Sequence, residues 1–133
     1  MKPFHLEIVT PEGAAFSGEA ESLLVRTGDG DVEILAGHTD YIASIGIGRA
    51  RIIAGGQSRV ASCSGGFLTV AGGEVKLVAI TFEFSEDIDL KRAEAAKTSA
   101  EAAIAAAKDA QEIECAKAKL SRALSRISVA SGR

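Results

Sequence analysis

The chain has 133 residues, of which 47% are hydrophobic and 25% are charged, and its formal net charge is −3. This composition is typical of a globular protein with a packed core and excludes a disordered chain. The negative charge argues against a nucleic-acid-binding protein, because such proteins gain much of their affinity by neutralising phosphates.

The first 85 residues carry the pattern of short strands. Phe4, Leu6 and Ile8 alternate with more polar residues, as in a half-buried strand. Further strand-like runs follow in chain order: AESLLVRT, GRARIIAG, SRVASC, FLTVA and EVKLVAITF. Gly55-Gly56 and Gly72-Gly73 separate successive runs, where tight hairpins need residues that tolerate positive φ. These features predict an antiparallel β-sandwich or barrel.

The stretch GDGDVEILAGH, residues 28–38, is rich in acidic residues. Asp29, Asp31 and Glu33 alternate, as carboxylates do in calcium-binding loops. The flanks are strand-like rather than helical, and His38 has no neighbouring His or Cys with which to bind zinc. Gly-Asp-Gly-Asp is also ordinary turn chemistry. The residues therefore favour a loop that faces solvent or a partner, and leave metal binding as an alternative.

The second half of the chain predicts two helices. Residues 74–131 contain no Gly or Pro, and half of residues 91–110 are alanine, the strongest helix former. Asp87 is the expected N-cap of the first helix, with Asp89 in its first turn. A break near Lys108-Asp109 would divide the region into an αα-hairpin.

Each expected helix carries a seam of apolar residues. The first seam is Ala93, Ala96, Ala100, Ala103 and Ala107, and the second is Ile113, Ala116, Leu120, Leu124 and Ile127. Small residues on the first seam would let the larger ones on the second approach closely. The predicted fold is a mostly β N-terminal sandwich, residues 1–85, plus a C-terminal α-helical hairpin, residues 86–133. Because a hairpin of this kind buries little apolar surface, we expect it to be marginally docked and able to change its arrangement.

Charge is distributed unevenly along the chain. All 18 acidic residues lie at or before Glu114, and the charged residues after Glu114 are all basic: Lys117, Lys119, Arg122, Arg126 and Arg133. Such a basic tail on an acidic protein suggests an acidic partner surface or an anionic ligand. Arg122 and Arg126 are four residues apart and share one helix face. Solvated faces with local ion pairs, or an anion site between the helices, are both compatible with this spacing.

The sequence shows no recognisable catalytic site. Its serines and histidines form no nucleophile–base–orienter pattern, and no glycine pair is followed by Lys-Ser or Lys-Thr as in a phosphate loop. Cys63 and Cys115 are far apart and predict free thiols in a reducing compartment. No run of about 20 apolar residues is present, and Glu7 interrupts the segment where a signal peptide needs one.

Three motifs in this order and spacing, GDVEILAGH, SGGFLTV and IDLKRAEAA, resemble the epsilon subunits of rotary ATP synthases over essentially the whole chain. The resemblance implies a non-catalytic subunit on the central stalk of a proton-translocating ATP synthase. It implies three partners, namely the gamma subunit, the c-subunit ring and, when the hairpin extends, the alpha/beta catalytic head. The resemblance further implies that no cofactor is required and that the chain reaches the membrane only through the complex, at the cytoplasmic face of a bacterial membrane.

The resemblance also assigns a contact with the rotor ring and the gamma subunit to Asp31, Gly37 and His38. The chain departs from the family at three places nearby. Glu33 stands where the family usually has Gly, Ala36 where it usually has Pro, and Thr39-Asp40 where Ala-Pro is common.

A second assignment concerns ATP as a regulatory ligand. Some bacterial members bind ATP in the folded hairpin through an I-D-x-x-R-A motif, which this chain matches within IDLKRA. The implied ATP-binding residues are Glu83, Ile88, Asp89, Arg92, Ala93, Arg122 and Arg126. Relatives often carry a further arginine on the first helix, and Lys97 is the nearest basic substitute here.

The basic helix has two implied roles. Lys117, Lys119, Arg122 and Arg126 would contact the catalytic head when the hairpin extends, and the two arginines would hold ATP when it folds. A ligand that contacts only one arrangement shifts the population toward it. Two other readings remain open: a free-standing ATP-sensing switch protein, and an enzyme built on the sandwich.

Overall fold

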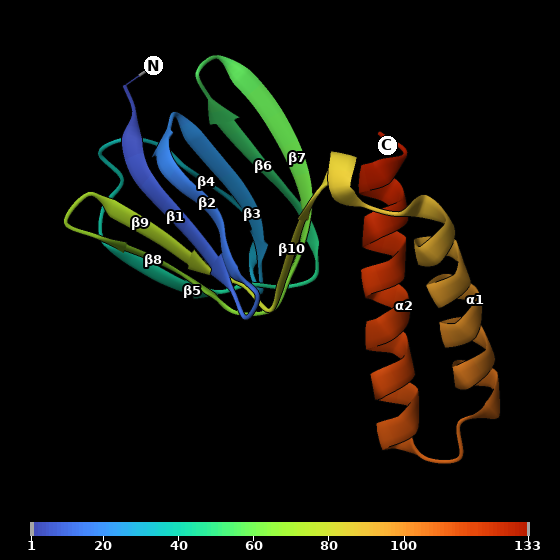
Figure 1. Cartoon of the computed structure of the whole chain (residues 1–133). Coiled ribbons are helices and arrows are strands. Elements are labelled where there is room, and N and C mark those ends of the chain that lie inside the picture. Colours follow the sequence, from blue (N-terminus) through green and yellow to red (C-terminus); the bar gives the residue numbers. More distant parts are fainter. Residues whose placement is uncertain (1, 133) are drawn as a thin grey trace. The chain divides into compact units, whose positions relative to one another are not determined.

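The computed structural model describes residues 2–132, and the chain separates into two compact units, Met1–Phe84 and Ser85–Arg133. The first unit is a β-sandwich and the second is a pair of α-helices, each traced by colour in Figure 1. This arrangement confirms the predicted fold class of a β-sandwich followed by a helical hairpin.

The sandwich consists of two five-stranded sheets. In spatial order the first sheet contains β2 (Gly13–Ala20), β1 (Phe4–Thr10), β9 (Glu74–Val78), β8 (Phe67–Ala71) and β5 (Tyr41–Ser44). The second contains β10 (Thr81–Phe84), β7 (Gln57–Ser64), β6 (Gly48–Ala54), β3 (Ser22–Thr27) and β4 (Gly30–Ile34). Neighbouring strands pair antiparallel except β1 and β9, which are parallel. The sandwich is therefore mostly, but not entirely, antiparallel.

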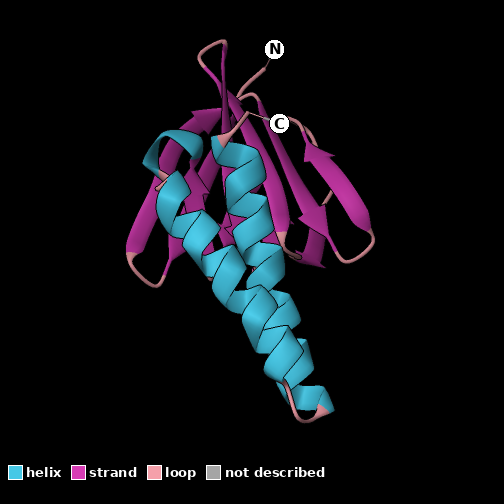
Figure 2. Cartoon of the chain, turned by 90° about the vertical axis from the view of Figure 1, so that its right-hand side faces the viewer, coloured by secondary structure: helices cyan, strands magenta, loops and turns pink. Residues whose placement is uncertain are grey.

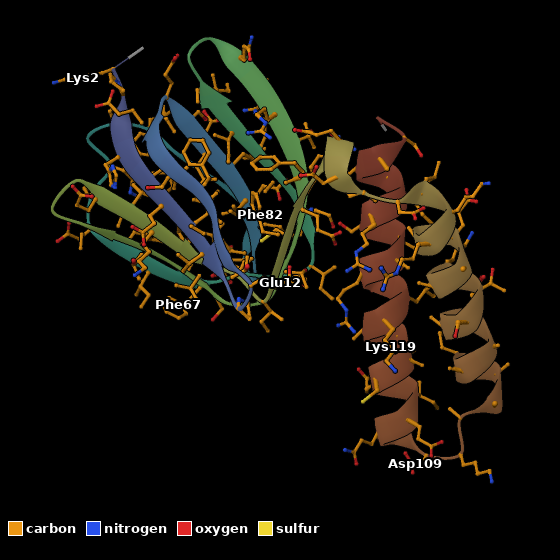
Figure 3. All side chains as sticks on the ribbon, viewed as in Figure 1. Lys2, Glu12, Phe67, Phe82, Asp109 and Lys119 are labelled. Atoms are coloured by element: carbon orange, nitrogen blue, oxygen red, sulfur yellow. The ribbon has the colours of Figure 1, made fainter. Side chains whose placement is uncertain are left out.

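The core of the sandwich follows from the alternation along its strands. Leu6 and Ile8 of β1 are fully buried, and so is Leu23 of β3 in the opposite sheet. Phe82 is buried and packs edge-to-face on Phe84, with ring centroids 5.3 Å apart (Figure 3). Alternate residues of strands such as β1, β8 and β9 thus remove their side chains from water between the two sheets, which is the main source of the fold's stability.

The run EVKLVAITF, predicted as one strand, forms two strands in different sheets. The Ala79 backbone N–H still donates to the Val9 carbonyl of β1, at 2.9 Å, whereas the Ile80 N–H donates to the Ser64 carbonyl of β7, at 3.1 Å. The chain therefore passes from one sheet to the other between these two residues. The sequence holds a trace of the change, because the buried positions step by two up to Ala79 and then skip to Phe82.

The glycine pairs form hairpins as predicted. Gly55 and Gly56 have φ values of 60° and 76°, and Gly72 and Gly73 have values of 57° and 83°. Positive φ at both central residues is the geometry of a type I′ turn, whose twist matches that of the flanking strands.

Three strands were missed by the sequence patterns, namely β2, β4 and β5. The prediction of a loop over residues 28–38 is wrong for its middle part, because residues 30–34 form β4 at the edge of the second sheet. These strands lack a long apolar alternation of their own. They form because a neighbouring strand supplies the hydrogen-bonding partner, which is tertiary rather than local information.

The hairpin unit contains a short 3₁₀ helix, η1 (Ser85–Asp87), followed by α1 (Leu90–Ala106) and α2 (Ala110–Ala130). Figure 2 shows α1 and α2 joined by a short connection at one end. The break near Lys108-Asp109 is confirmed. The N-cap prediction is wrong, because Asp87 belongs to η1 and Asp89 caps α1.

The predicted packing of large residues on α2 against small ones on α1 is confirmed only in part. The buried residues of α1 are Ala93 and Ala100, and those of α2 are Ala116, Ala123 and Val129. Leu124 is 45% exposed, while the remaining large residues of the predicted second seam are half-buried. The hairpin therefore has alanine on both sides of its interface, which allows the helix backbones to lie close together.

Candidate functional site

The start of α1 shows what the IDLKRA segment does locally. The Asp89 backbone is extended, with φ −82° and ψ 104°, and its Oδ1 accepts a hydrogen bond from the Arg92 backbone N–H at 3.1 Å. This is an N-cap bond, which satisfies one of the free donors at the helix start. Ala93 is buried and Ile88 is half-buried, while the Arg92 side chain is exposed. The motif therefore fixes the beginning of the helix and presents one guanidinium to solvent.

A groove runs between the two helices further along α1. Its volume is about 250 Å³, and it is lined by Ala96, Ser99, Ala100 and Ala103 of α1 and by Lys119, Arg122, Ala123 and Arg126 of α2. The α1 wall consists only of small side chains, and the α2 wall carries three cations. No acidic residue is among the lining residues. Guanidinium and ammonium groups in a concave site suit the oxygens of a phosphate or another anion.

Arg92 lies on the same flank of α1 as this groove. It precedes Ala96, Ser99 and Ala103 by four, seven and eleven residues, which is the spacing of one helix face. The capped first turn of α1 thus continues the α1 wall of the groove toward the helix N-terminus.

The structure divides the implied ATP-binding residues between the two units. Ile88, Asp89, Arg92 and Ala93 gather at the start of α1, and the two arginines of α2 line the groove. Glu83 lies in the sandwich unit, on β10, where it pairs in register with Ser62 of β7. Lys97 is not among the groove's lining residues.

The start of α2 is held by a reciprocal cap at the hairpin connection. The Glu112 backbone N–H donates to Asp109 Oδ1 at 2.8 Å, and Glu112 Oε2 accepts from the Lys108 backbone N–H at 2.8 Å. This arrangement resembles a capping box and fixes where the second helix begins. Asp109 and Lys119 are labelled in Figure 3 at this end and midway along α2.

The four residues implied to contact the catalytic head do not share one face of α2. Lys119, Arg122 and Arg126 line the groove, but Lys117 does not. Two residues of helix turn Lys117 by about 160° away from Lys119. The α2 helix therefore presents a row of three cations on its groove side and one cation on the other side.

Asp31 lies on the edge strand β4 and pairs with a cation of its neighbour. Its Oδ1 accepts from Arg26 Nε at 3.3 Å across the β3–β4 pair, and both side chains are about half exposed. The preceding turn is tied by Thr27, whose Oγ1 accepts from the Asp29 N–H and donates to the Gly30 carbonyl. The Gly-Asp-Gly-Asp stretch is thus a hairpin turn that leads into a solvent-facing carboxylate.

Gly37 and His38 lie in the turn after β4. Gly37 has φ 83°, and the His38 N–H donates to the Leu35 carbonyl at 3.2 Å. The His38 ring is fixed by an Nδ1 contact of 2.7 Å with the Thr39 carbonyl and by an edge-on approach to Tyr41. The structure does not bring His38 next to Asp31. Asp31 begins the strand segment 31–34, which is about 10 Å long, and His38 lies beyond the other end of that segment.

Sequence reasoning missed the cations that face the acidic residues of β4. Arg26 pairs with Asp31, and Arg51 of β6 binds Glu33 through an Nη2–Oε2 contact of 2.9 Å. The only local signal was the strand periodicity of β3 and β6. The charge pairs are set by the registers of β4 and β6 against β3, which cannot be read from any one strand alone.

Residues 2–132 contain neither a metal-binding cluster nor a membrane-spanning helix. No group of three or more His, Cys, Asp or Glu residues there is arranged to hold a metal ion. Neither described helix combines the length and apolar character needed to cross a membrane.

Comparison with known proteins gives the same division of the chain. Residues 3–85 match the family described as ATP synthase, Delta/Epsilon chain, beta-sandwich domain. Residues 86–131 match the ATP synthase, Delta/Epsilon chain, long alpha-helix domain.

Individual relatives match along nearly the full chain. The ATP synthase epsilon chain of Bacillus velezensis is 39% identical over 130 residues, which are 98% of both chains. The epsilon chain of Caldicellulosiruptor saccharolyticus is 39% identical over 127 residues, covering 96% of this chain and 93% of the relative.

Two solved structures share the fold. A chain of the Euglena gracilis mitochondrial ATP synthase, OSCP/F1/c-ring, superposes with a TM-score of 0.77 at 21% identity, covering 90% of this chain and 76% of that one. A chain of the Tetrahymena thermophila mitochondrial ATP synthase, central stalk and c-ring, has a TM-score of 0.67 at 13% identity, covering 95% of both. With both domains matched in order and relatives 39% identical over nearly their whole length, the chain belongs to the ATP synthase delta/epsilon chain family.

Proposed function

We propose that this non-catalytic epsilon subunit couples the gamma subunit and the c-subunit ring of a proton-translocating ATP synthase to the alpha/beta catalytic head. The relatives that match nearly the whole chain carry the name ATP synthase epsilon chain. The central stalk and c-ring named for the Tetrahymena structure support the proposed place of this chain in the complex. Membrane association then arises through the complex, at the cytoplasmic face of a bacterial membrane.

The hairpin is proposed to bind ATP as a regulatory ligand, with no cofactor required. The observation that supports this is the groove in which Arg122 and Arg126 of α2 face the small side chains of α1. The triphosphate would lie against these cations, and Arg92 in the adjoining first turn of α1, which Asp89 caps, would complete the site. Glu83, on the sandwich unit, stays a prediction from the family motif.

ATP binding would act on the arrangement of the hairpin. The α1–α2 interface buries mainly alanines, so little apolar surface holds the two helices together. A ligand that contacts both walls of the groove stabilises the folded hairpin relative to any arrangement in which the helices separate. When ATP leaves, the basic row of α2 becomes available to an acidic surface of the catalytic head and restrains hydrolysis.

The sandwich is proposed to make the contact with the rotor. Asp31 lies on an exposed edge strand, and its pairing with Arg26 is solvent-accessible and therefore weak. A basic or polar group on the c ring can compete for such a carboxylate, and burial at the interface would strengthen the new pair. Gly37 and His38 form a separate, turn-based contact point beyond the other end of β4, suited to the gamma subunit or the ring.

The test is ATP hydrolysis by a catalytic head with its gamma subunit, reconstituted with the full-length chain. We expect the wild-type chain to lower the hydrolysis rate and added ATP to relieve the inhibition. The double variant Arg122→Glu and Arg126→Glu should lose both effects, because both depend on the same two cations. Lys117→Glu, a charge reversal outside the groove, serves as the control for the loss of ATP relief.

Two outcomes would count against the proposal. If the double variant inhibits and responds to ATP as the wild type does, the arginines carry neither role. If the full-length chain and a chain ending after Glu86 give the same rate, the hairpin is not inhibitory and the subunit's role reduces to coupling. A chain that binds ATP but does not associate with the gamma subunit would instead favour the free-standing sensor.

A further inference from the structure

The groove of the hairpin presents a third cation that the family motif does not assign to the nucleotide. Lys119 lines the groove together with Arg122 and Arg126. The spacing of three and then four residues keeps the three side chains within a sector of about 60° around α2. Along the helix axis the row from Lys119 to Arg126 is about 10 Å long, at 1.5 Å per residue.

The opposite wall leaves space in front of this row. The small α1 residues that line the groove are Ala96, Ser99, Ala100 and Ala103, and only Ser99 among them carries a polar side-chain group. Its hydroxyl can donate a hydrogen bond to an oxygen of an anion held by the cations. The α1 wall thus contributes volume and one hydroxyl, while the charge comes entirely from α2.

Lys97 does not supply the missing charge on α1. It lies two residues before Ser99, which turns it by about 160° from the groove flank, and it is not among the lining residues. Lys119 lines the groove instead, from the opposite helix. The groove therefore contains a third cation from α2 where the family leads us to expect one from α1.

The surroundings of Lys119 suit an anionic ligand. Lys119 also lines a neighbouring groove of about 510 Å³ near the hairpin connection, whose lining includes the acidic residue Glu112. The Glu112 carboxylate is engaged by the backbone N–H of Lys108 in the cap of α2. The acidic side chain that lines this neighbouring groove is thus held at the start of α2, and the groove with the three cations is lined by cations and small residues.

We propose that Lys119 binds the phosphate chain of the nucleotide together with Arg122 and Arg126, so that the groove selects triphosphates over shorter phosphates. A row of three cations about 10 Å long matches an elongated polyanion, whereas a single phosphoryl group can contact only part of it. The inference rests on the proposed ATP site of the hairpin and adds to it the residue that reads the length of the phosphate chain.

The test measures binding of ATP, ADP, AMP and inorganic tripolyphosphate to the full-length chain by isothermal titration calorimetry. Lys119→Gln should weaken ATP and tripolyphosphate binding about tenfold, the loss expected for one charge-assisted hydrogen bond. AMP binding should change by less than about twofold, as for a distant surface charge. Lys119→Arg should restore ATP binding, because it keeps the cation in the groove.

The matched control is Lys117→Gln, which removes the same charge from the same helix but from its other face. It should leave ATP affinity within about twofold of the wild type. Helical circular dichroism of each variant verifies that the hairpin remains folded, since Lys119 and Lys117 are both exposed and their replacement removes no core contact.

The outcomes separate this inference from the proposed ATP site. If the wild type binds ATP and Lys119→Gln has no effect, or no more than Lys117→Gln, the role of Lys119 is overturned while the ATP site stands. If the wild type binds tripolyphosphate through Lys119 but not ATP, the phosphate-reading row is supported and the nucleotide site is overturned. If it binds neither ligand, both proposals are overturned.

Discussion

Replacing Asp89 tests whether this motif residue acts through the fold of the hairpin or through the ligand. Its Oδ1 accepts the N-cap hydrogen bond from the Arg92 backbone at 3.1 Å. Asp89→Ala removes this bond, at about 1 kcal/mol, and also removes a negative charge from the positive end of the helix dipole, at about 0.5 kcal/mol. Asp89→Asn keeps the cap and loses only the charge term, since Asn and Asp cap equally well.

We therefore expect the free energy of unfolding of the hairpin to fall by about 1.5 kcal/mol in the alanine variant and by about 0.5 kcal/mol in the asparagine variant. The assay is urea unfolding followed by circular dichroism at 222 nm, which reports mainly on the two helices. Asp109→Ala and Asp109→Asn are the matched controls, because Asp109 caps α2 outside the groove through a bond of 2.8 Å.

The two readouts can contradict the reasoning separately. If Asp89→Asn destabilises the hairpin as much as Asp89→Ala, the carboxylate charge and not the cap bond stabilises α1. ATP affinity should follow the same order, with asparagine near the wild type. If asparagine keeps the stability but loses ATP binding, Asp89 contacts the nucleotide directly, and the structural explanation of this motif residue is refuted.

Two further predictions concern the sandwich. Gly66→Ala should destabilise the sandwich by about 3 kcal/mol or more, because the φ of Gly66 is 94° and a Cβ there would overlap the Val78 carbonyl of the adjoining strand. Gly55→Ala, which has open space around it, should cost about 1–2 kcal/mol. Fluorescence of the single tyrosine during urea unfolding measures both, and equal losses would show that the close approach is unimportant. Burial raises the pKa of the Cys63 thiol from 9.0 to about 12, so a thiol reagent at pH 8 should modify only Cys115 in the folded chain. The free energy of unfolding should fall between pH 9 and pH 12, because in this range the Cys63 thiol ionises only in the unfolded chain. Two reactive thiols in the folded state would contradict this burial.

The helical half shows how far local pattern reaches. Alanine content and the absence of Gly and Pro place both helices, and the break near Lys108-Asp109 follows from the same signals. The N-cap of α1 does not follow from local pattern, because Asp87 and Asp89 are two residues apart and have the same capping chemistry. Asp89 is the cap because Asp87 belongs to the 3₁₀ turn η1.

The sandwich half shows where local pattern stops. The alternation of apolar and polar residues predicts β1 from the sequence. By contrast, β4 forms only because β3 lies beside it and supplies its hydrogen-bonding partners. Likewise, EVKLVAITF has strand propensity throughout, and only the competing partners β1 and β7 divide it between two sheets.

The candidate site depends on both kinds of information. Helix spacing alone puts Arg122 and Arg126 on one face, and the resemblance of IDLKRA to the family motif directs attention to ATP. Lys119 belongs to the groove, and Lys117 and Lys97 do not, because of the way in which α1 and α2 face each other, which the sequence alone does not give.

The sequence by itself determined the order of the two domains, most strands, the two glycine hairpins, both helices and the family. These depend on composition, on periods of two and 3.6 residues, and on short motifs, all of which are written locally. The tertiary structure decided the sheet switch after Ala79, the strand β4, the N-cap at Asp89 and the row of cations in the groove. These depend on which distant segment becomes the neighbour, because a strand or helix face acquires its partner only when the chain has folded.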